Sequence, residues 1–167
     1  PEARGGMDAW RDSSRRGMSG DVPGTSVCVT GDVDGVWVDS DGKRIVVDYK
    51  ATWKKEEVTL DAPWQDGDRR QVEVYQWLLR RSGHTVSDRA YFVYCNGDAD
   101  KEAFDGKLEF RVQIIEYVGD DGWVEYVVRA AYECLHSDVV PPPRQDCDSC
   151  PLRAAANAAL GLDSPHN

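Results

Sequence analysis

Two aspartates and a lysine, Asp34, Asp48 and Lys50, have the residue types needed to place a divalent cation beside an ammonium group. Two carboxylates, together with a backbone oxygen and water, form the oxygen shell that suits Mg²⁺ or Mn²⁺. Because side chains alternate along a strand, Asp48 and Lys50 should project from the same face. An ammonium group there could orient or help to deprotonate an attacking water molecule, and could stabilise charge that develops on a phosphate.

A simpler interpretation is that these acids only flank turns and keep the ends of a hairpin soluble. Aspartate is disfavoured within strands, and Asp48 follows the apolar run Ile45-Val46-Val47, where a carboxylate without a cation would be poorly placed. This context favours a functional Asp48, and Lys50 gains weight from its position beside that carboxylate. Asp32 shares a strand face with Asp34, either as a supporting group or, in the interpretation we favour, as a solvated acid.

A β-hairpin is the first element expected to position these residues. Valines and Trp37 recur from Ser26 to Asp39, Asp41-Gly42 supplies a turn, and a second β-rich run leads into Asp48. Pairing within this hairpin would bring Asp34 and Asp48 within reach of one ion.

An amphipathic helix is predicted next, over residues 69–82. Its apolar residues recur at helical spacing, Asp68 suits the N-cap, and Gly83 suits the C-terminal stop. Gln71 and Tyr75 lie one helical turn apart and face the same way, although a core tyrosine with a capping glutamine would give the same pattern.

The remaining pattern completes an α/β fold. The expected elements are a mobile connection over 53–68, a buried strand over 86–95, an alternating strand over 108–117, a helix over 123–135 and a short helix over 151–160. Their order predicts a central mixed β-sheet flanked by helices. We divide the chain into a loop or remnant of an N-terminal helix over 1–24, a core domain over 25–137, and a proline-rich linker with a C-x-x-C tail over 138–167.

Composition narrows the class of protein. A chain of 167 residues suits one compact domain, and it has neither an apolar run long enough to span a bilayer nor a signal peptide pattern, so we expect a soluble cytoplasmic protein with no membrane partner. Five scattered cysteines suggest reduced thiols. The net charge of -10 argues against a broadly basic surface for nucleic acid, unless bound cations and patches such as Arg15-Arg16, Arg69-Arg70 and Arg80-Arg81 meet the phosphates.

Several aromatic and histidine residues have an ambiguous pattern. Trp53, Trp64 and Trp77 could stack on nucleobases, although aromatic residues more often belong to a core. His84 and His166 are expected at the surface without a role.

The ordered set of Gly31-x-x-Asp34, Asp48-Tyr49-Lys50 after an apolar strand, and Gln71-x-x-x-Tyr75 on the next helix resembles the PD-(D/E)xK nuclease superfamily. The RecB-like exonuclease branch, which includes CRISPR-adaptation nucleases, is the most similar. The resemblance covers residues 26–95 and implies that the core over 25–137 is restriction-endonuclease-like.

The resemblance implies Mg²⁺- or Mn²⁺-dependent hydrolysis of DNA phosphodiester bonds. The enzyme would be an exonuclease of DNA repair, recombination, or phage or CRISPR processing, with single-stranded DNA or duplex ends as its partner. The implied catalytic residues are Asp34, Asp48, Lys50, Gln71 and Tyr75, and the implied metal ligands are Asp34, Asp48 and the carbonyl of Tyr49.

The sequence departs from the family in two places. Relatives usually carry a histidine or glutamate on a helix before the hairpin, whereas Glu2 is the sole glutamate before Asp34 and no histidine precedes it. Many relatives also bind an iron-sulfur cluster through a C-terminal C-x-x-C and one further cysteine. Here Cys147 and Cys150 match the pair, but Ala154-Ala155-Ala156 occupies the place of the last ligand, so we do not expect a four-cysteine cluster.

Two other functions remain open at this level. A catalytically incomplete module of the nuclease fold would bind DNA or a protein partner without cutting, in keeping with the acidic charge. A zinc-stabilised interaction domain would use residue types suited to tetrahedral coordination: Cys134, His136, Cys147 and Cys150.

Overall fold

The computed structural model describes residues 17–62, 65–98, 106–139, 141–142, 147 and 149–161. The chain forms two compact units, residues 1–130 and 131–167. The sequence-based expectations for Glu2, Arg15-Arg16, Trp64 and His166 lie outside the described residues.

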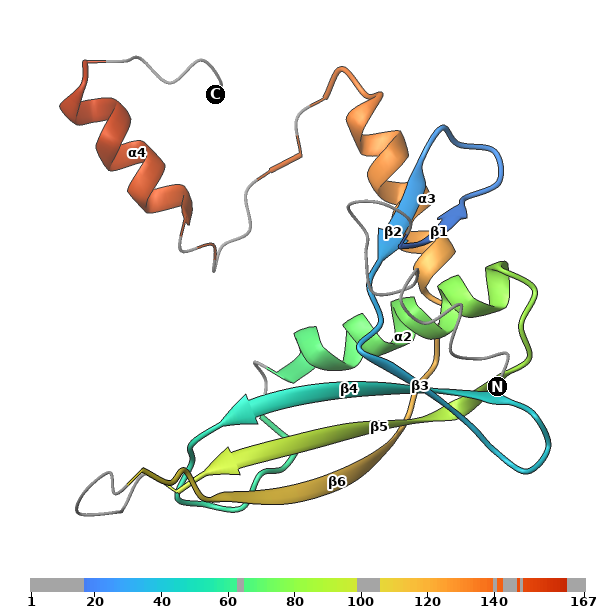
Figure 1. Ribbon diagram of the computed structural model, residues 1–167. Helices are drawn as coiled ribbons and strands as arrows, with labels where there is room; N and C mark the ends of the chain where they lie inside the picture. The colour runs from blue at the N-terminus through green and yellow to red at the C-terminus, as the bar shows by residue number, and fades with distance from the viewer. Residues whose placement is uncertain are drawn as a thin grey trace. The chain divides into compact units, whose positions relative to one another are not determined.

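A four-stranded mixed sheet forms the centre of the first unit (Figure 1). Its strands lie in the order β3 (Gly35–Val38), β4 (Arg44–Thr52), β5 (Val86–Gly97) and β6 (Phe110–Val118). The β3–β4 and β5–β6 pairs are antiparallel, whereas β4 and β5 are parallel. This topology confirms the prediction of a mixed sheet in an α/β fold.

Helix α2 (Asp66–Arg81) connects β4 to β5 and packs on one face of the sheet (Figure 1). Its fully buried residues Val72, Leu78 and Leu79 recur at helical spacing, as the sequence predicted. The helix ends at the Ser82 cap, which is followed by Gly83 at a φ of 82° that suits glycine.

The N-terminus of α2 differs from the prediction, because the N-cap residue is Gln65 rather than Asp68. Gln65 is buried, and its side chain contacts the backbone of Thr59 and Ala62 in the connection from β4. Asp68 therefore lies within the first turn, where its carboxylate contacts Lys50 instead of capping the helix.

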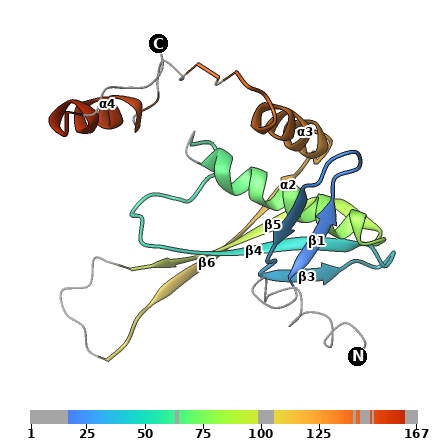
Figure 2. The same ribbon diagram turned by 90° about the horizontal axis from the view of Figure 1, so that it is seen from above.

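A second, two-stranded sheet corrects two predictions. Strand β1 (Met18–Asp21) pairs antiparallel with β2 (Cys28–Gly31), although residues 1–24 were expected to be loop or a remnant of a helix. The sequence of β1 carries little β signal, and the strand is supported by β2 and by α2, which contacts both strands (Figure 2). The predicted strand over 26–39 is in fact β2 and β3, separated by residues 32–34.

Glycines permit this small sheet to approach α2 closely. A Cβ atom on Gly20 would lie 2.9 Å from the ring of Trp77, and one on Gly31 would lie 2.9 Å from the ring of Tyr75. Gly31 therefore fixes the distance between the start of the 32–34 connection and the helix.

Two further helices follow the central sheet. Helix α3 (Val124–Leu135) matches the predicted helix, and Val124 in its first turn is buried in the core of the first unit. Helix α4 (Ser149–Ala159), in the second unit, lies close to its predicted span and includes Pro151 in its first turn. Within the described parts of the chain, no helix has the length and apolarity needed to cross a membrane.

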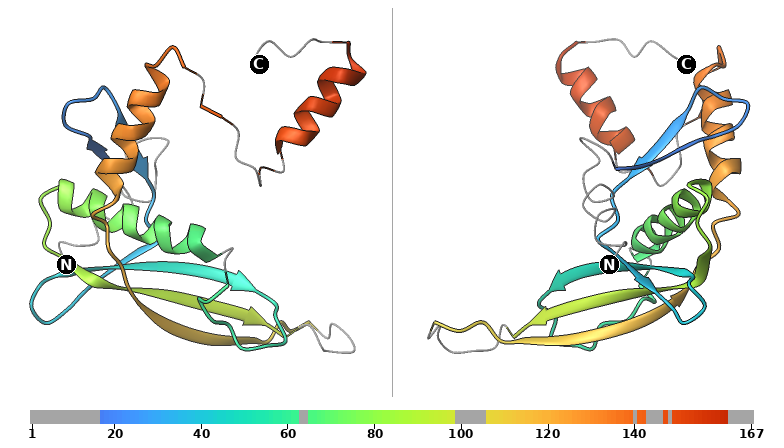
Figure 3. Two further views of the ribbon diagram at one scale, coloured as in Figure 1. Left: turned by 180° about the vertical axis from the view of Figure 1, so that it is seen from behind. Right: turned by 45° about the vertical axis from the view of Figure 1, so that its right-hand side comes forward.

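The face of the sheet opposite α2 carries many exposed apolar side chains. Four residues of β6 on this face are each more than half exposed, namely Phe110, Val112, Ile114 and Val118. Figure 3 shows this face of β4, β5 and β6 turned away from α2. The two faces of the sheet thus differ sharply in burial.

Candidate active site

Asp34 and Asp48 meet where strand β3 begins. Gly35 pairs with Val47, so the register continued by one residue places Asp34 opposite Asp48. The sequence had suggested that Asp34 lies within a strand, but the structure places it in the connection just before β3. Its Oδ2 accepts a hydrogen bond of 3.0 Å from the backbone N–H of Tyr49. The carboxylate therefore takes the place of a backbone partner at the end of the β3–β4 ladder.

Asp48 lies on the face of β4 that α2 covers, and it is only 2% exposed. Its Oδ2 lies 2.9 Å from the ammonium Nζ of Lys50, although no hydrogen bond of regular geometry reaches that oxygen within the described residues. Burial raises the pKa of Asp48, the charges of Asp34 and Asp68 add to this rise, and Lys50 opposes it. The site thus holds an acid whose charged form needs a nearby cation.

The ammonium group of Lys50 contacts three oxygen atoms. These are Oδ2 of Asp48 at 2.9 Å, Oδ1 of Asp68 at 3.1 Å and Oε1 of Gln71 at 3.1 Å. Burial lowers the pKa of Lys50, but the carboxylates of Asp48 and Asp68 outweigh it, so the net shift is upward. Lys50 is therefore held as an ammonium ion close to three oxygen atoms.

Asp68 is the site residue that sequence reasoning missed. It had been interpreted as a cap, because aspartate before an apolar helix is a common N-cap signal. A second signal was present, since Asp68 and Gln71 are three residues apart and share one side of a helix. Both residues reach Lys50 from that side.

Gln71 links Lys50 to Tyr75. The Nε2 group of Gln71 donates a hydrogen bond of 2.7 Å to the hydroxyl of Tyr75, while its Oε1 accepts from Lys50. Burial raises the pKa of Tyr75, with a smaller opposing effect from Gln71 and added upward effects from Asp48 and Asp34. The structure thus brings all five sequence-predicted residues into one cluster, and their catalytic roles remain predictions.

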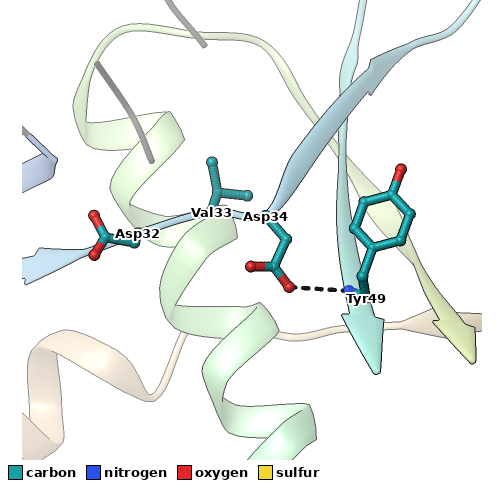
Figure 4. A pocket seen from close by; sticks show the side chains of 4 residues that line it. All are labelled: Asp32, Val33, Asp34 and Tyr49. Carbon is teal, nitrogen blue, oxygen red and sulfur yellow. Dashed lines mark hydrogen bonds between the residues drawn. The ribbon is translucent and has the colours of Figure 1, made fainter. Parts of the chain in front are cut away.

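An open pocket of about 430 Å³ lies beside this cluster, lined by Asp32, Val33, Asp34 and Tyr49 (Figure 4). Val33 is fully buried and anchors the connection that carries the two acids. Asp32 is partly buried rather than a fully solvated acid, and its Oδ1 has no hydrogen-bond partner among the described residues. A buried carboxylate oxygen without a donor beside an open pocket suits a cation.

The donor set fits a hard divalent cation. Asp34, Asp48 and the carbonyl of Tyr49 are oxygen ligands of the kind that Mg²⁺ and Mn²⁺ prefer, and the pocket has room for water. Asp48 is buried, which raises the free energy of its charged form, and a positive charge nearby lowers that free energy again.

The zinc site considered from the sequence is not assembled. Within the described residues, no three histidine, cysteine, aspartate or glutamate side chains lie in an arrangement that could hold a metal. Cys134, His136, Cys147 and Cys150 all fall within that part of the chain, so the structure does not bring together the zinc ligands that the sequence had left open as an alternative. Cys147 and Cys150 do contact each other at the start of α4, where a hydrogen bond from Cys150 lowers the pKa of Cys147. The two thiols share local contacts, but His136 and Cys134 do not join them.

The structure separates the tryptophans that the sequence had grouped. Trp77 is 6% exposed and belongs to the core, whereas Trp53 is 79% exposed at the end of β4. Only Trp53 of these two can meet a ligand from solvent.

The fold and the cluster define a restriction-endonuclease-like α/β protein with an acid-rich site at the end of a β-hairpin. A family model of the PD-(D/E)XK nuclease superfamily matches residues 4–155, and the chain therefore belongs to this superfamily. Membership supports nuclease activity in general. Nucleases of this superfamily generally use Mg²⁺ or Mn²⁺ for hydrolysis.

One solved structure is similar to this chain at low sequence identity. The crystal structure of SSO0001 is similar at 18% sequence identity and a TM-score of 0.41, over 84% of this chain and 56% of that one. The chain thus spans little more than half the length of that protein. No curated protein matches the chain.

Proposed function

We propose that this chain is a Mg²⁺- or Mn²⁺-dependent deoxyribonuclease that acts on single-stranded DNA or on duplex ends. The observation that carries this proposal is the ammonium group of Lys50, which is held by Asp48, Asp68 and Gln71. A scissile phosphate could enter the open pocket that is lined by Asp34 and by Tyr49, the neighbour of Lys50 in the chain.

Asp34, Asp48 and the carbonyl of Tyr49 would hold the metal. When bound, such a cation acts as a Lewis acid on the phosphate and lowers the pKa of water. Tyr49 can serve in this way because its N–H is already fixed by Asp34, which holds this part of β4 in place. Asp32 lies on the other side of Val33 in the same pocket, and its carboxylate points away from that of Asp34 (Figure 4).

Lys50 acts in this proposal as a positive charge rather than as a base. Its pKa is raised, and a protonated ammonium has no lone pair with which to accept a proton. If Asp48 coordinated a divalent metal ion, Asp68 and Gln71 would still hold Nζ of Lys50. One N–H of this ammonium group could then orient the attacking water or a phosphate oxygen. Tyr75 and Gln71 fix the position of this group through their hydrogen bond.

The biological setting is part of the proposal and rests on the resemblance to RecB-like exonucleases. It includes cutting from an end, a role in DNA repair, recombination, or phage or CRISPR processing, and a cytoplasmic location.

Cleavage of end-labelled single- and double-stranded DNA tests the proposal. The wild type is expected to cut with Mn²⁺ or Mg²⁺ and not with chelator, and Asp48→Ala and Lys50→Ala should abolish cutting. Asp41→Ala is a matched control, because Asp41 is an exposed acid in the turn between β3 and β4. Closed circular DNA should resist the enzyme if cutting starts from an end.

Absence of cutting by the wild type in both metals would overturn the proposal. Metal-dependent binding of the same DNA without cleavage would then support the alternative, a module of the nuclease fold that binds but does not cut.

A further inference from the structure

A second pocket, largely apolar, lies at the ends of three strands of the central sheet. It has a volume of about 430 Å³ and is lined by residues 51–53 at the end of β4, 97–98 at the end of β5, and 108–110 at the start of β6. Its large side chains, Trp53, Leu108 and Phe110, are all more than half exposed. Exposed aromatic and aliphatic groups around a hollow are typical of a binding site rather than of a core.

This pocket and the pocket that contains Asp34 lie along the same face of β4. Side chains alternate along a strand, so Tyr49 and Ala51 project from the same face, and Trp53 continues the same alternation just past the end of β4. Tyr49 lines the pocket that contains Asp34, whereas Ala51 and Trp53 line the apolar pocket. Four residues of strand span about 13 Å, so this face of β4 leads from Tyr49 at the Asp34 pocket to Trp53 at the apolar pocket, while Asp48 and Lys50 project from the opposite face.

The chemistry of the apolar pocket suits a nucleobase. Trp53 and Phe110 offer aromatic faces, and stacking on such faces accepts any of the bases. Gly97 leaves space beside Phe110, because a Cβ atom at that position would lie 3.5 Å from its ring. Asp98 and Glu109 also line the pocket and can accept hydrogen bonds from the exocyclic amino groups of bases.

The charges around the pocket favour a base inside and a phosphate outside. Carboxylates within the lining repel phosphate, so the sugar-phosphate backbone must run along the rim. Lys54 follows Trp53 and Lys107 precedes Leu108, which places positive charge next to the aromatic walls. A single strand presents unpaired bases to such a pocket, whereas an intact duplex does not.

We propose that this pocket binds an unpaired nucleobase of a DNA strand whose backbone reaches the Asp34 pocket. The inference deepens the proposed function and rests on it, because it makes a single strand or frayed end the substrate. Bases stack about 3.4 Å apart along one strand, so a path of about 13 Å along β4 corresponds to about four nucleotides, or fewer in a stretched strand.

Binding of a fluorescent single-stranded oligonucleotide in Ca²⁺, measured by anisotropy, tests the pocket without a requirement for cleavage. Trp53→Ala should weaken binding of the oligonucleotide on the order of tenfold relative to the wild type. Trp53→Phe, which keeps an aromatic face, should bind nearly as tightly as the wild type. Val118→Ser is the matched control, because Val118 is also exposed on this face but lies at the far end of β6. Blunt duplex of the same length should respond less to Trp53→Ala.

An abasic site moved through the oligonucleotide sharpens the test. One position should weaken binding to the wild type, and the same position should have no further effect on Trp53→Ala. If the wild type cuts DNA, Trp53→Ala should raise KM for single strands and leave kcat nearly unchanged.

The outcomes separate this inference from the proposed function. Weaker binding by Trp53→Ala in a protein that cuts no DNA would support the pocket and overturn the nuclease. Equal binding by the wild type and by Trp53→Ala, with circular dichroism showing both folded, would overturn the pocket alone. A change of oligomeric state in Trp53→Ala with unchanged DNA binding would also overturn it, because the pocket would then be a protein interface.

Discussion

Asp48 on β4 and Glu73 on α2 are both buried carboxylates, at 2% and 8% exposure, but their surroundings differ. Oε1 of Glu73 accepts hydrogen bonds from the hydroxyl of Tyr117 at 2.6 Å and from the N–H of Asp120 at 3.2 Å. Its Oε2 accepts from the indole of Trp123 at 2.6 Å. Oδ2 of Asp48, by contrast, has the ammonium of Lys50 nearby but no regular hydrogen bond within the described residues.

The contrast separates a structural acid from a candidate catalytic one. Neutral donors from three other positions surround Glu73, and these bonds connect α2 to β6 and to the start of α3. Burial raises the pKa of Asp48, and within the described residues Asp48 shares the ammonium group of Lys50 with Asp68. A buried acid with complete hydrogen bonding stabilises the fold, whereas one with incomplete bonding at an open pocket is suited to binding a cation.

Removal of the Asp48 carboxylate should have the largest effect, and the effect should be on activity. Asp48→Ala is expected to lower kcat/KM by about 10³-fold or more, since the site loses charge that holds the cation. The free energy of unfolding should stay the same or rise, because a buried charge with incomplete bonding is removed while Lys50 keeps Asp68 and Gln71 as partners. DNA-cleavage assays check the expected loss of activity, and urea unfolding checks the stability. An Asp48→Ala variant that is stable and still cuts DNA would show that Asp48, like Glu73, is not catalytic.

Removal of the Glu73 carboxylate should have the opposite pattern. Glu73→Ala leaves the donors of Tyr117, Trp123 and Asp120 without their acceptor, so the free energy of unfolding should fall by about 3 kcal/mol. The fraction that remains folded should cut DNA with a kcat near that of the wild type. Urea unfolding and kcat at a temperature well below the transition provide the measurement, and a normal stability would mean that this network is not structural.

Loosening of Lys50 should have a smaller effect. Asp68→Asn removes one charged partner of the ammonium group and is expected to lower kcat about tenfold, or about 1.4 kcal/mol, with little change in KM. Asp66→Asn is the control in the same helical turn, since Asp66 pairs with Arg69 instead. Faster modification of Lys50 by an amine-reactive reagent would report its release. Equal kcat in both variants would place Asp68 outside the site.

The weakest expected effect tests one bond of the Glu73 network. Tyr117→Phe should cost about 1 kcal/mol of unfolding free energy at neutral pH, the usual contribution of a single hydrogen bond. Burial, followed by the bond to Glu73, raises the pKa of Tyr117 from 10.0 to about 12 in the folded protein.

The sign of the pH dependence follows from this shift. Because the folded pKa is higher than the unfolded one, the stabilisation is complete below pH 10 and is lost as the pH rises toward about 12. Thermal unfolding across this range should show a steeper loss in the wild type than in Tyr117→Phe. Parallel curves would show that the hydroxyl contributes no pH-dependent stability.

The sequence predicted those features that depend on neighbouring residues. The periodic apolar residues of α2 determine a helix with one buried face, and the alternation of β4 places Asp48 and Lys50 together on that face. The same local logic placed Gln71 and Tyr75 one turn apart, and the structure joins them with a hydrogen bond. The mixed sheet followed from the order of strands and helices.

Only the tertiary structure decided the partners of polar groups that are far apart in the chain. Glu73 meets Tyr117 and Trp123 across 44 and 50 residues, and no periodic pattern encodes such a pairing. Strand β1 forms because β2 and α2 support a segment with little β preference of its own. The contact of Asp68 with Lys50, the exposure of Trp53 and the burial of Trp77 were decided in the same way, because burial is a property of packing and not of residue type.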